Sequence, residues 1–319
     1  MLDRTQGIEP GAWQEALDVA RDAGLDGVLF AHSRTVSPDL DGGELRAAGQ
    51  AFADAGLFVE VGVGELGPSG EDADRIADLT ASLRAAADLG ARQIFGFTRT
   101  VRDPGLTRHR AQMDLIAGRL AQLRPVLEDA GQILNVKTHE DLSSHQVLEL
   151  VERAGPDRYA VSLDVANLVV RGEDPVEAAR RLAPHIRQTH LEDVVLFFIE
   201  QGLRRRLRPV GDGILDWAAL LDVLATTPAT TLVIEQHLGR FDADIFEDEW
   251  LAGEPHLAVA ELTRLVAGAV RTEAAAREGR GPSLADLDPE TTIAERRADL
   301  RRGITRLREL ADAQKEAAA

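Results

Sequence analysis

Ionisable side chains follow four short apolar runs in the second half of the 319-residue sequence. Each run has the composition of a buried strand, and the residues directly after the four runs are Lys137-Thr138-His139-Glu140-Asp141, Asp164, His190 and Glu235. Carboxylate oxygens and imidazole nitrogens together suit Mn²⁺, Mg²⁺ or Co²⁺, and imidazole can also transfer protons. If the fold gathers the four strand ends, the pattern predicts a divalent-metal site with acid–base groups beside it.

Each of these residues also has a purely structural interpretation. Asp164 could cap the turn that follows it, and His190 could be a core histidine. Glu235 follows three apolar residues, and a carboxylate in such a position needs a cation or hydrogen-bond donors. His139 could act as an acid or base because imidazole titrates near neutral pH, or it could only orient other groups. We expect a shared site because four successive strands end in such residues.

The elements that must position these residues repeat one pattern: an Ala-rich amphipathic stretch, a glycine and a short apolar run. The glycines of the five repeats are Gly24, Gly56, Gly90, Gly131 and Gly155. Glycine suits the left-handed residue that ends a helix, and helix–strand units of this length are typical of a parallel α/β fold. Ile186–His190 and Thr231–Gln236 bring the number of strands to seven, and Leu2–Ile8 is a weak eighth. We therefore predict a (β/α)8 TIM barrel, whose site lies at the carboxyl ends of its strands.

The C-terminal part has a different organisation. Arg277–Pro282 interrupts the helical pattern, and Asp288-Pro289-Glu290 has the composition of a helix start. We predict a TIM-barrel catalytic domain over residues 1–276 and a C-terminal helical extension, made of a linker and an amphipathic helix, over residues 277–319. The apolar stripe of that helix consists of Ile293, Leu300, Ile304, Leu307 and Ala311. This stripe could pack on its own barrel or form a contact between subunits.

Composition excludes several classes of protein. The chain has 36 basic and 54 acidic residues, and its formal net charge of −18 disfavours binding to nucleic acid or to an anionic membrane. It contains no cysteine, which excludes disulfides, thiolate metal sites and cysteine nucleophiles. The first ten residues do not resemble a signal peptide, and no apolar run reaches the ~20 residues of a membrane span. We therefore expect a cytoplasmic protein. No GxGxxG or P-loop motif follows a predicted strand, so the sequence lacks the motifs of dinucleotide-binding and P-loop proteins.

Five stretches carry a resemblance to a known family: THEDLSS from Thr138, SLDVANLVVRGEDP from Ser162, QTHLEDV from Gln188, RPVGDGILDW from Arg208 and VIEQ from Val233. Over Gly7–Val266 the chain resembles the xylose-isomerase-like TIM-barrel superfamily, which includes sugar phosphate isomerases and epimerases. The resemblance implies one divalent metal, Mn²⁺ first with Mg²⁺ or Co²⁺ as alternatives, held by Glu, Asp, His and Glu. Asp164, His190 and Glu235 match three of these ligands. Lys137 stands where the family has its first Glu, and an ammonium group cannot bind a cation, so the substitution argues against a four-ligand metal site.

The residue at position 137 also bears on the reaction that the resemblance implies. Epimerases of this superfamily exchange a proton α to a carbonyl between two carboxylates, whose positions here are Lys137 and Glu235. A lyase is easier to arrange with Glu235 alone, and His139 could supply its acid or base. Our first hypothesis is therefore a lyase that cleaves 3-keto (C-)glycosides. The alternatives are a ketose epimerase or isomerase and a metal-free pseudo-enzyme or scaffold barrel, while the net charge disfavours the superfamily's AP endonuclease branch.

The segment Leu196–Arg208 resembles the large subunit of C-glycoside deglycosidases and related keto-sugar lyases. Its arginines, Arg204, Arg205, Arg206 and Arg208, are predicted to form a solvated charge run rather than a substrate or subunit clamp. Phe197 and Phe198 are expected on an exposed loop that serves as a lid or an interface. These features indicate an oligomer that acts on a small sugar or glycoside, with or without a second small subunit.

Overall fold

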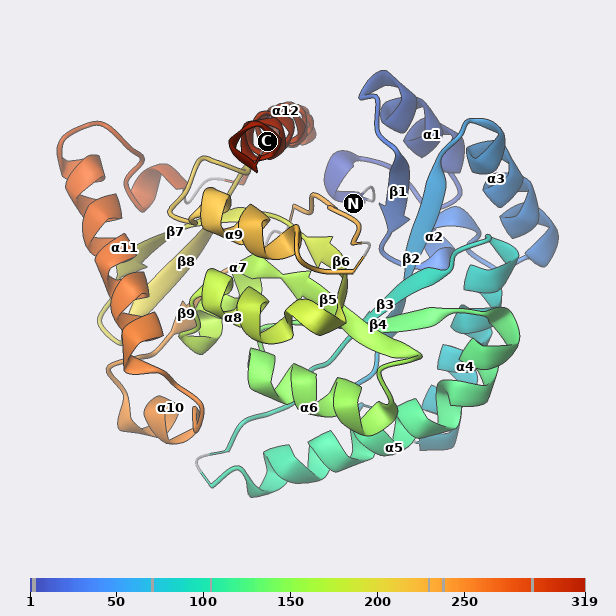
Figure 1. Cartoon of the computed structure of the whole chain (residues 1–319), viewed down its shortest axis with the longest axis horizontal. Coiled ribbons are helices and arrows are strands. Elements are labelled where there is room, and N and C mark those ends of the chain that lie inside the picture. Colours follow the sequence, from blue (N-terminus) through green and yellow to red (C-terminus); the bar gives the residue numbers. More distant parts are fainter. Residues whose placement is uncertain are drawn as a thin grey trace. The chain divides into compact units, whose positions relative to one another are not determined.

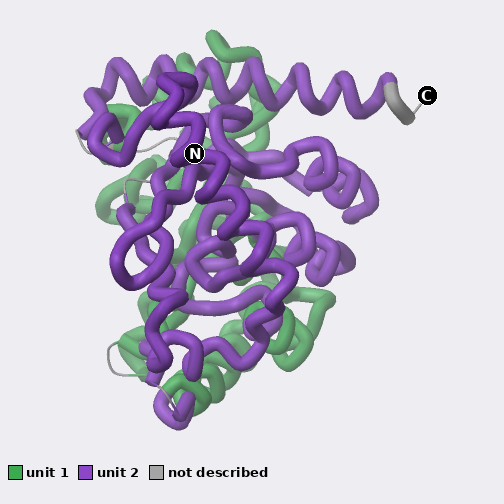
Figure 2. The backbone as a smooth tube through the Cα atoms, turned by 90° about the vertical axis from the view of Figure 1, so that its left-hand side faces the viewer, with its two compact units in different colours: residues 1–100, 109–137, 147–162 green, residues 101–108, 138–146, 163–319 purple. Residues whose placement is uncertain are grey.

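The structure is a computed structural model that describes residues 1, 4–69, 72–103, 105–228, 230–236, 239–287 and 290–318 (Figure 1). The chain divides into two compact units (Figure 2). Unit 1 consists of residues 1–100, 109–137 and 147–162, and unit 2 consists of residues 101–108, 138–146 and 163–319. Helices and strands alternate along most of the chain, as predicted for an α/β protein.

Six strands of one sheet follow one another in the order of the sequence. They are β1 (Gly27–Phe30), β2 (Phe58–Glu65), β3 (Gln93–Phe97), β4 (Ile133–Lys137), β5 (Tyr159–Asp164) and β6 (Ile186–His190). Strands β1 to β5 pair in parallel, for example through Val136 of β4 opposite Val161 of β5. Most of their side chains are buried, as expected for a parallel sheet with both faces covered. These six strands confirm six of the eight predicted from the sequence.

Helices and turns separate these strands. They are η1 (Arg4–Gln6), α1 (Trp13–Asp22), α2 (Ser33–Val36), α3 (Gly42–Asp54), α4 (Asp72–Asp88), α5 (Thr107–Ala130), α6 (Ser144–Ala154), α7 (Val165–Leu168), η2 (Val169–Arg171), α8 (Pro175–Leu182) and η3 (Ala183–His185). Gly56 and Gly90 follow α3 and α4 with φ of +75° and +82°, which glycine adopts without steric cost. The predicted order of helix, glycine and strand is confirmed at both positions.

Two predicted strands differ in the structure. Arg4–Gln6 forms the 3-10 helix η1, and residues 2 and 3 lie outside the described part of the chain, so no described residue of Leu2–Ile8 is in a strand. That segment has too few β-branched and aromatic residues to favour an extended backbone. In Thr231–Gln236 only two isolated parallel bridges form, from Thr231 to Gln188 and from Ile234 to Leu191. This segment therefore runs beside the end of β6 without a continuous ladder.

Unit 2 contains an antiparallel sheet that the sequence pattern did not predict. Its strands, in order, are β7 (Asp193–Phe198), β8 (Leu203–Arg208) and β9 (Phe241–Ala243). Helix α11 (Val259–Arg277) packs against β7. Phe197 is 4% exposed, and Phe198 packs against the hydrophobic core that β7 and α11 share. The expectation of an exposed loop at Phe197 and Phe198 is therefore wrong, because hairpin pairing turns the segment into core strands.

The arginine run lies on β8. Arg205 and Arg206 are only 2% and 7% exposed, whereas Arg204 is partly exposed and pairs with Asp242 of β9 at 2.7 Å. Successive side chains of a strand point to opposite faces, and on β8 both faces are largely covered. The prediction of a solvated charge run is therefore wrong for Arg205 and Arg206.

The remaining elements of unit 2 are α9 (Trp217–Leu224), α10 (Asp248–Ala252), η4 (Ala285–Leu287) and α12 (Ile293–Ala318). Helix α12 begins after Thr292, whose hydroxyl accepts a hydrogen bond from the Glu295 N–H while the Glu295 carboxylate accepts one from the Thr292 N–H. Of the predicted start, residues 288 and 289 lie outside the described residues, and Glu290 precedes the helix. No helix among the described residues is long and apolar enough to cross a membrane.

The apolar stripe of α12 lies largely inside unit 2. Leu300, Ile304 and Leu307 are buried, and α12 packs against α9. Ile293, at the start of the helix, is 45% exposed. Of the two interpretations of the stripe, packing on the chain itself accounts for the three buried residues.

Candidate functional site

Four of the five predicted site residues belong to unit 2, and Lys137 belongs to unit 1. In unit 2, Asp164 and His190 are the last residues of β5 and β6, His139 lies in the loop after β4, and Glu235 follows the bridge at Ile234. The carboxyl ends of the strands thus carry the predicted groups, as the sequence indicated.

His190 and Glu235 are in direct contact. His190 Nδ1 lies 2.7 Å from Glu235 Oε2, and the two side chains are 0% and 3% exposed. The backbone holds them in register, because the Leu191 N–H donates to Val233 O at 2.7 Å and the Glu235 N–H donates to Leu191 O at 3.2 Å. An imidazole beside a buried carboxylate orients it and can stabilise its charge. The pair can therefore bind and transfer a proton.

Asp164 adopts the capping role that its position allows. Its Oδ1 accepts hydrogen bonds from the N–H groups of Ala166 and Asn167, both at 3.1 Å. Its Oδ2 accepts from Asn167 Nδ2 at 2.8 Å, so both oxygens are engaged at the start of α7. Thr138 fixes the backbone of Asp164 as well, since its hydroxyl accepts from the Asp164 N–H at 2.7 Å.

His139 lies between two neighbouring carboxylates. Its Nδ1 is 3.0 Å from Asp141 Oδ1 and its Nε2 is 2.8 Å from Glu140 Oε2. Burial lowers the pKa of His139, but the hydrogen bonds to Asp141 and Glu140 outweigh burial, and the pKa is raised above its ordinary value. A raised pKa favours the imidazolium form near neutral pH, which can donate a proton or hold the two carboxylates in place.

Lys137 is the last residue of β4 and is buried in unit 1. Its side chain is 3% exposed, and its Nζ lies 5.9 Å from the centre of the Phe95 ring. The ring face attracts the ammonium group, which helps to offset the cost of burying the charge. The structure thus places a buried lysine, stacked over an aromatic ring, at position 137.

A pocket of about 580 Å³ in unit 2 gives the site an opening. Two buried carboxylates, Glu192 and Glu235, line it, together with Arg206 and the first turns of α12. Glu192 was not among the predicted site residues. The signal that could have found it is its position two residues after the end of β6, beside His190.

Asp193, the next residue, has a structural role. Its carboxylate accepts hydrogen bonds from the N–H groups of Gly211 and Leu215 at 3.1 and 3.2 Å and from Trp217 Nε1 at 2.7 Å. Burial raises its pKa, although these hydrogen bonds act in the opposite direction. The glycine at Gly213 is required by this packing, because a Cβ there would lie 2.2 Å from Asp193 Oδ1. Asp193 therefore fixes the loop before α9, whose residues Pro209 and Val210 line the pocket.

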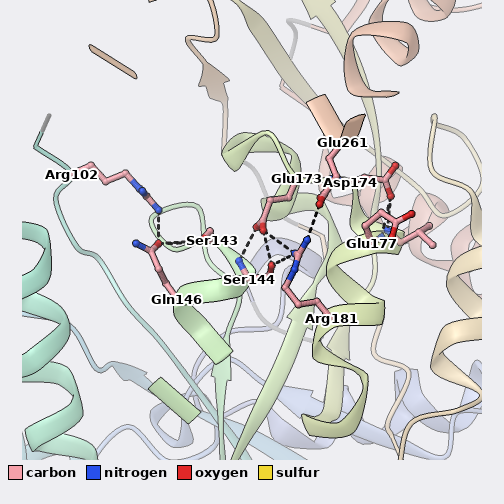
Figure 3. Close-up of polar contacts among 10 residues, drawn as sticks. Arg102, Ser143, Ser144, Gln146, Glu173, Asp174, Glu177, Arg181 and Glu261 are labelled. Atoms are coloured by element: carbon pink, nitrogen blue, oxygen red, sulfur yellow. Dashed lines mark hydrogen bonds and ion pairs between the residues drawn. The ribbon is translucent and has the colours of Figure 1, made fainter. Parts of the chain in front are cut away.

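A second buried polar network supports the loops of unit 2 (Figure 3). Glu173 accepts hydrogen bonds from the Ser144 N–H and hydroxyl at 2.8 and 2.5 Å and from Arg181 at 3.1 Å. Arg181 also contacts Glu261 of α11 at 2.7 Å. Burial raises the pKa of Glu173 to about 7, although its hydrogen bonds act in the opposite direction. The network joins the start of α6 to α8 and α11, and none of its residues lines the pocket.

The described side chains of unit 2 are not arranged to hold a divalent metal. Asp164 is engaged on both oxygens, and His190 contacts Glu235 through Nδ1. Within the described ranges, no three His, Asp or Glu side chains converge into a group that could hold a metal ion. A buried guanidinium, Arg205, interacts electrostatically with Asp164, Glu192, Glu140 and Glu235. The charge of Arg205 thus already acts on these acidic groups.

Comparisons with known proteins agree with this architecture. The family model described as the xylose isomerase-like TIM barrel matches residues 17–255, which confirms the predicted fold class. The uncharacterized protein YihM of Escherichia coli (strain K12) is 31% identical over 109 residues, a match that spans 34% of this chain and only 33% of that protein. An L-ribulose 3-epimerase structure is 22% identical with a TM-score of 0.58, covering 89% of this chain and 96% of its own. A structure of the IolI protein with a bound zinc atom is 14% identical with a TM-score of 0.59, covering 85% and 96%.

Proposed function

Because the chain belongs to the xylose isomerase-like TIM barrel family, we propose that it is an enzyme that removes a proton α to the carbonyl of a sugar or keto sugar. The observation that carries the proposal is the buried Glu235 carboxylate, which contacts His190 at 2.7 Å and lines the pocket of unit 2. A carboxylate in such surroundings can remove a proton from a carbon atom of the substrate when the substrate displaces water from the pocket.

The reaction that we propose first is elimination from a 3-keto glycoside, including a C-glycoside. Glu235 removes the proton from the carbon beside the ketone, and the electron pair of the broken C–H bond forms an enolate. When the ketone re-forms, a double bond forms to the anomeric carbon, and the bond to the aglycone breaks. His139, whose raised pKa favours the protonated form, gives the departing group its proton. Atoms and charge balance without an oxidant or a second substrate.

Two of the other predicted residues have supporting roles in this proposal. His190 orients Glu235, and Asp164 fixes the loop that follows β5. Lys137 belongs to unit 1 and is assigned no step in this proposal. The Mn²⁺, Mg²⁺ or Co²⁺ that the resemblance implies is not assigned a step, because the side chains that the structure describes in unit 2 are not arranged to hold it.

A sugar or ketose epimerase is the second candidate. It is favoured by Glu192, since two buried carboxylates, Glu192 and Glu235, line the same pocket. Two-sided proton exchange needs two such groups on opposite faces of one carbon. The solved L-ribulose 3-epimerase shares the fold, which is compatible with either candidate.

Proton abstraction is tested in D2O, where both candidates incorporate deuterium into the substrate or product. The purified protein is incubated with 3-keto glucosides and separately with free ketoses, and aglycone release, epimer formation and deuterium are measured by chromatography and NMR. Aglycone release supports the lyase, and epimer formation without it supports the epimerase. If the protein releases no aglycone, forms no epimer and incorporates no deuterium, the pseudo-enzyme alternative is supported.

The matched variants are Glu235→Gln and Glu200→Gln. Glu235→Gln removes the base while keeping the side chain's size, and we expect exchange to fall at least about 100-fold. Glu200 is exposed in the turn between β7 and β8, and its variant should retain the rate of the unmodified chain. Equal rates for all three proteins would contradict the role of Glu235.

A further inference from the structure

Arg205 is a buried arginine in the middle of the antiparallel sheet. It is the third residue of β8 and is 2% exposed, although it belongs to a run of charged residues. Its guanidinium carbon lies 5.0 Å from the centre of the Phe241 ring on the neighbouring strand. Arginine keeps its charge in proteins, so the fold must supply compensation for this cation.

Direct contacts join Arg205 to the loop after β5. Its Nη1 donates hydrogen bonds to Ala166 O at 3.0 Å and to Asn167 Oδ1 at 2.6 Å. Asn167 in turn donates from Nδ2 to Asp164 Oδ2 at 2.8 Å. The cap of α7 is therefore tied to the guanidinium through one shared asparagine.

Four acidic residues provide the compensating charge. Burial lowers the pKa of Arg205, while the charges of Asp164, Glu192, Glu140 and Glu235 act in the opposite direction. Two of them, Glu192 and Glu235, line the pocket. The Arg205 Nε–H is buried and has no hydrogen-bond partner among the described residues, so this donor is available to an acceptor that enters the site.

We propose that Arg205 is the permanent counter-ion of Glu140, Asp164, Glu192 and Glu235, and that it takes the place that a divalent metal occupies in other proteins of this fold. It is a positioning residue, because its Nη1 holds Asn167, which in turn donates to Asp164, and because its fixed charge acts on the acidic groups. A metal ion entering this cluster would meet an immobile positive charge at short range, which lowers its affinity. The inference rests on the proposed function only in taking this cluster as the active site.

Metal binding is the direct test and needs no substrate. The unmodified chain, Arg205→Met, Arg205→Lys and Arg204→Met are each loaded with MnCl2, dialysed and analysed for metal by mass spectrometry. Thermal unfolding with MnCl2 and with EDTA is recorded in parallel. Arg204→Met is the matched control, because it removes a neighbouring arginine whose partner is Asp242 at the edge of the sheet.

Without the Arg205 charge, the four carboxylates lack a counter-ion. The variant also releases Asn167, whose amide engages Asp164 Oδ2, so that the Asp164 carboxylate can turn toward a metal. We therefore expect Arg205→Met to bind about one Mn²⁺ per chain and to gain thermal stability from it. The unmodified chain, Arg204→Met and Arg205→Lys should bind none and should melt at the same temperature with Mn²⁺ and with EDTA. Lysine keeps a positive charge but lacks the planar guanidinium, so Arg205→Lys shows whether the charge or the shape of Arg205 prevents metal binding.

Two outcomes would overturn the inference: stoichiometric metal in the unmodified chain, or a folded Arg205→Met that binds none. If Arg205→Met does not fold, the unmodified chain and Arg205→Lys decide, because metal uptake by either one contradicts a fixed counter-ion. If the metal results are as expected and no substrate reacts, the proposed function fails while the counter-ion stands.

Discussion

Two buried basic side chains distinguish the chemistry of this chain from that of a carboxylate-rich metal site. Lys137 in unit 1 is 3% exposed, and Arg205 in unit 2 is 2% exposed. Neither side chain can ligate a metal in its charged form, and the guanidinium of Arg205 keeps its charge. Each unit therefore contains a buried basic side chain of its own.

Lys137→Glu restores the residue type that the related motif has at this position. We expect the variant to take up no Mn²⁺, because Arg205 remains in place and both Asp164 oxygens stay engaged in the cap. Metal content after loading and dialysis measures this. The control is Lys315→Glu, which changes the only other lysine, 78% exposed on α12. Uptake of about one Mn²⁺ by Lys137→Glu alone would show that position 137 decides metal binding.

Among the elements, the loop anchors of unit 2 depend on buried carboxylates. Glu173 holds the first residue of α6 and is linked through Arg181 to α11, and Asp193 holds the loop before α9. Both groups have raised pKa values because burial disfavours their charged forms. The docking of these elements should therefore respond to pH.

Glu173→Gln tests this response. The folded pKa of about 7 exceeds the ordinary value of 4.5, so the folded state holds the proton more tightly than the unfolded state. The stability from this group is present below pH 4.5 and is lost as pH rises to about 7, by at most about 3 kcal/mol. The variant cannot titrate, so its free energy of unfolding should fall less than that of the unmodified chain over this range. Urea unfolding at several pH values measures the difference, and parallel curves would contradict the prediction.

The packing of α12 gives a second prediction about elements. Leu307 is 7% exposed on the stripe of a helix that packs against α9, so Leu307→Ala should leave a cavity and lower the free energy of unfolding by about 2–4 kcal/mol. Ile293→Ala, at an exposed position of the same stripe, should change it by less than about 0.5 kcal/mol. Denaturant unfolding compares the two. Equal, small effects would mean that the stripe does not stabilise the chain and would favour the subunit-contact interpretation.

For the whole molecule, net charge decides which large partners are compatible. At −18, the chain repels a phosphate backbone, and the pocket of unit 2 is lined by acidic as well as basic side chains. A small neutral substrate is not subject to this repulsion. The charge thus agrees with a sugar or glycoside as the substrate class of the proposed enzyme.

Binding to abasic DNA checks this point. We expect a fluorescent abasic duplex to show no anisotropy change up to ~10 µM protein at low salt, where electrostatic attraction would be strongest. A duplex without the abasic site serves as the control for non-specific binding. Salt-sensitive binding of the abasic duplex would revive the endonuclease alternative.

Local sequence determined the repeated helix, glycine and strand, because the positive φ at Gly56 and Gly90 and the apolar strand runs depend on neighbouring residues. It also placed Asp164 and His190 at strand ends. The contacts of these residues depend on distant segments and required the folded chain. His190 meets Glu235 45 positions away, and Arg205 becomes buried only because β8 pairs with β7 and β9. A run of arginines by itself predicts exposed side chains, because burying a charge costs free energy. The carboxylates that offset this cost come from distant parts of the sequence, so only the folded chain shows them.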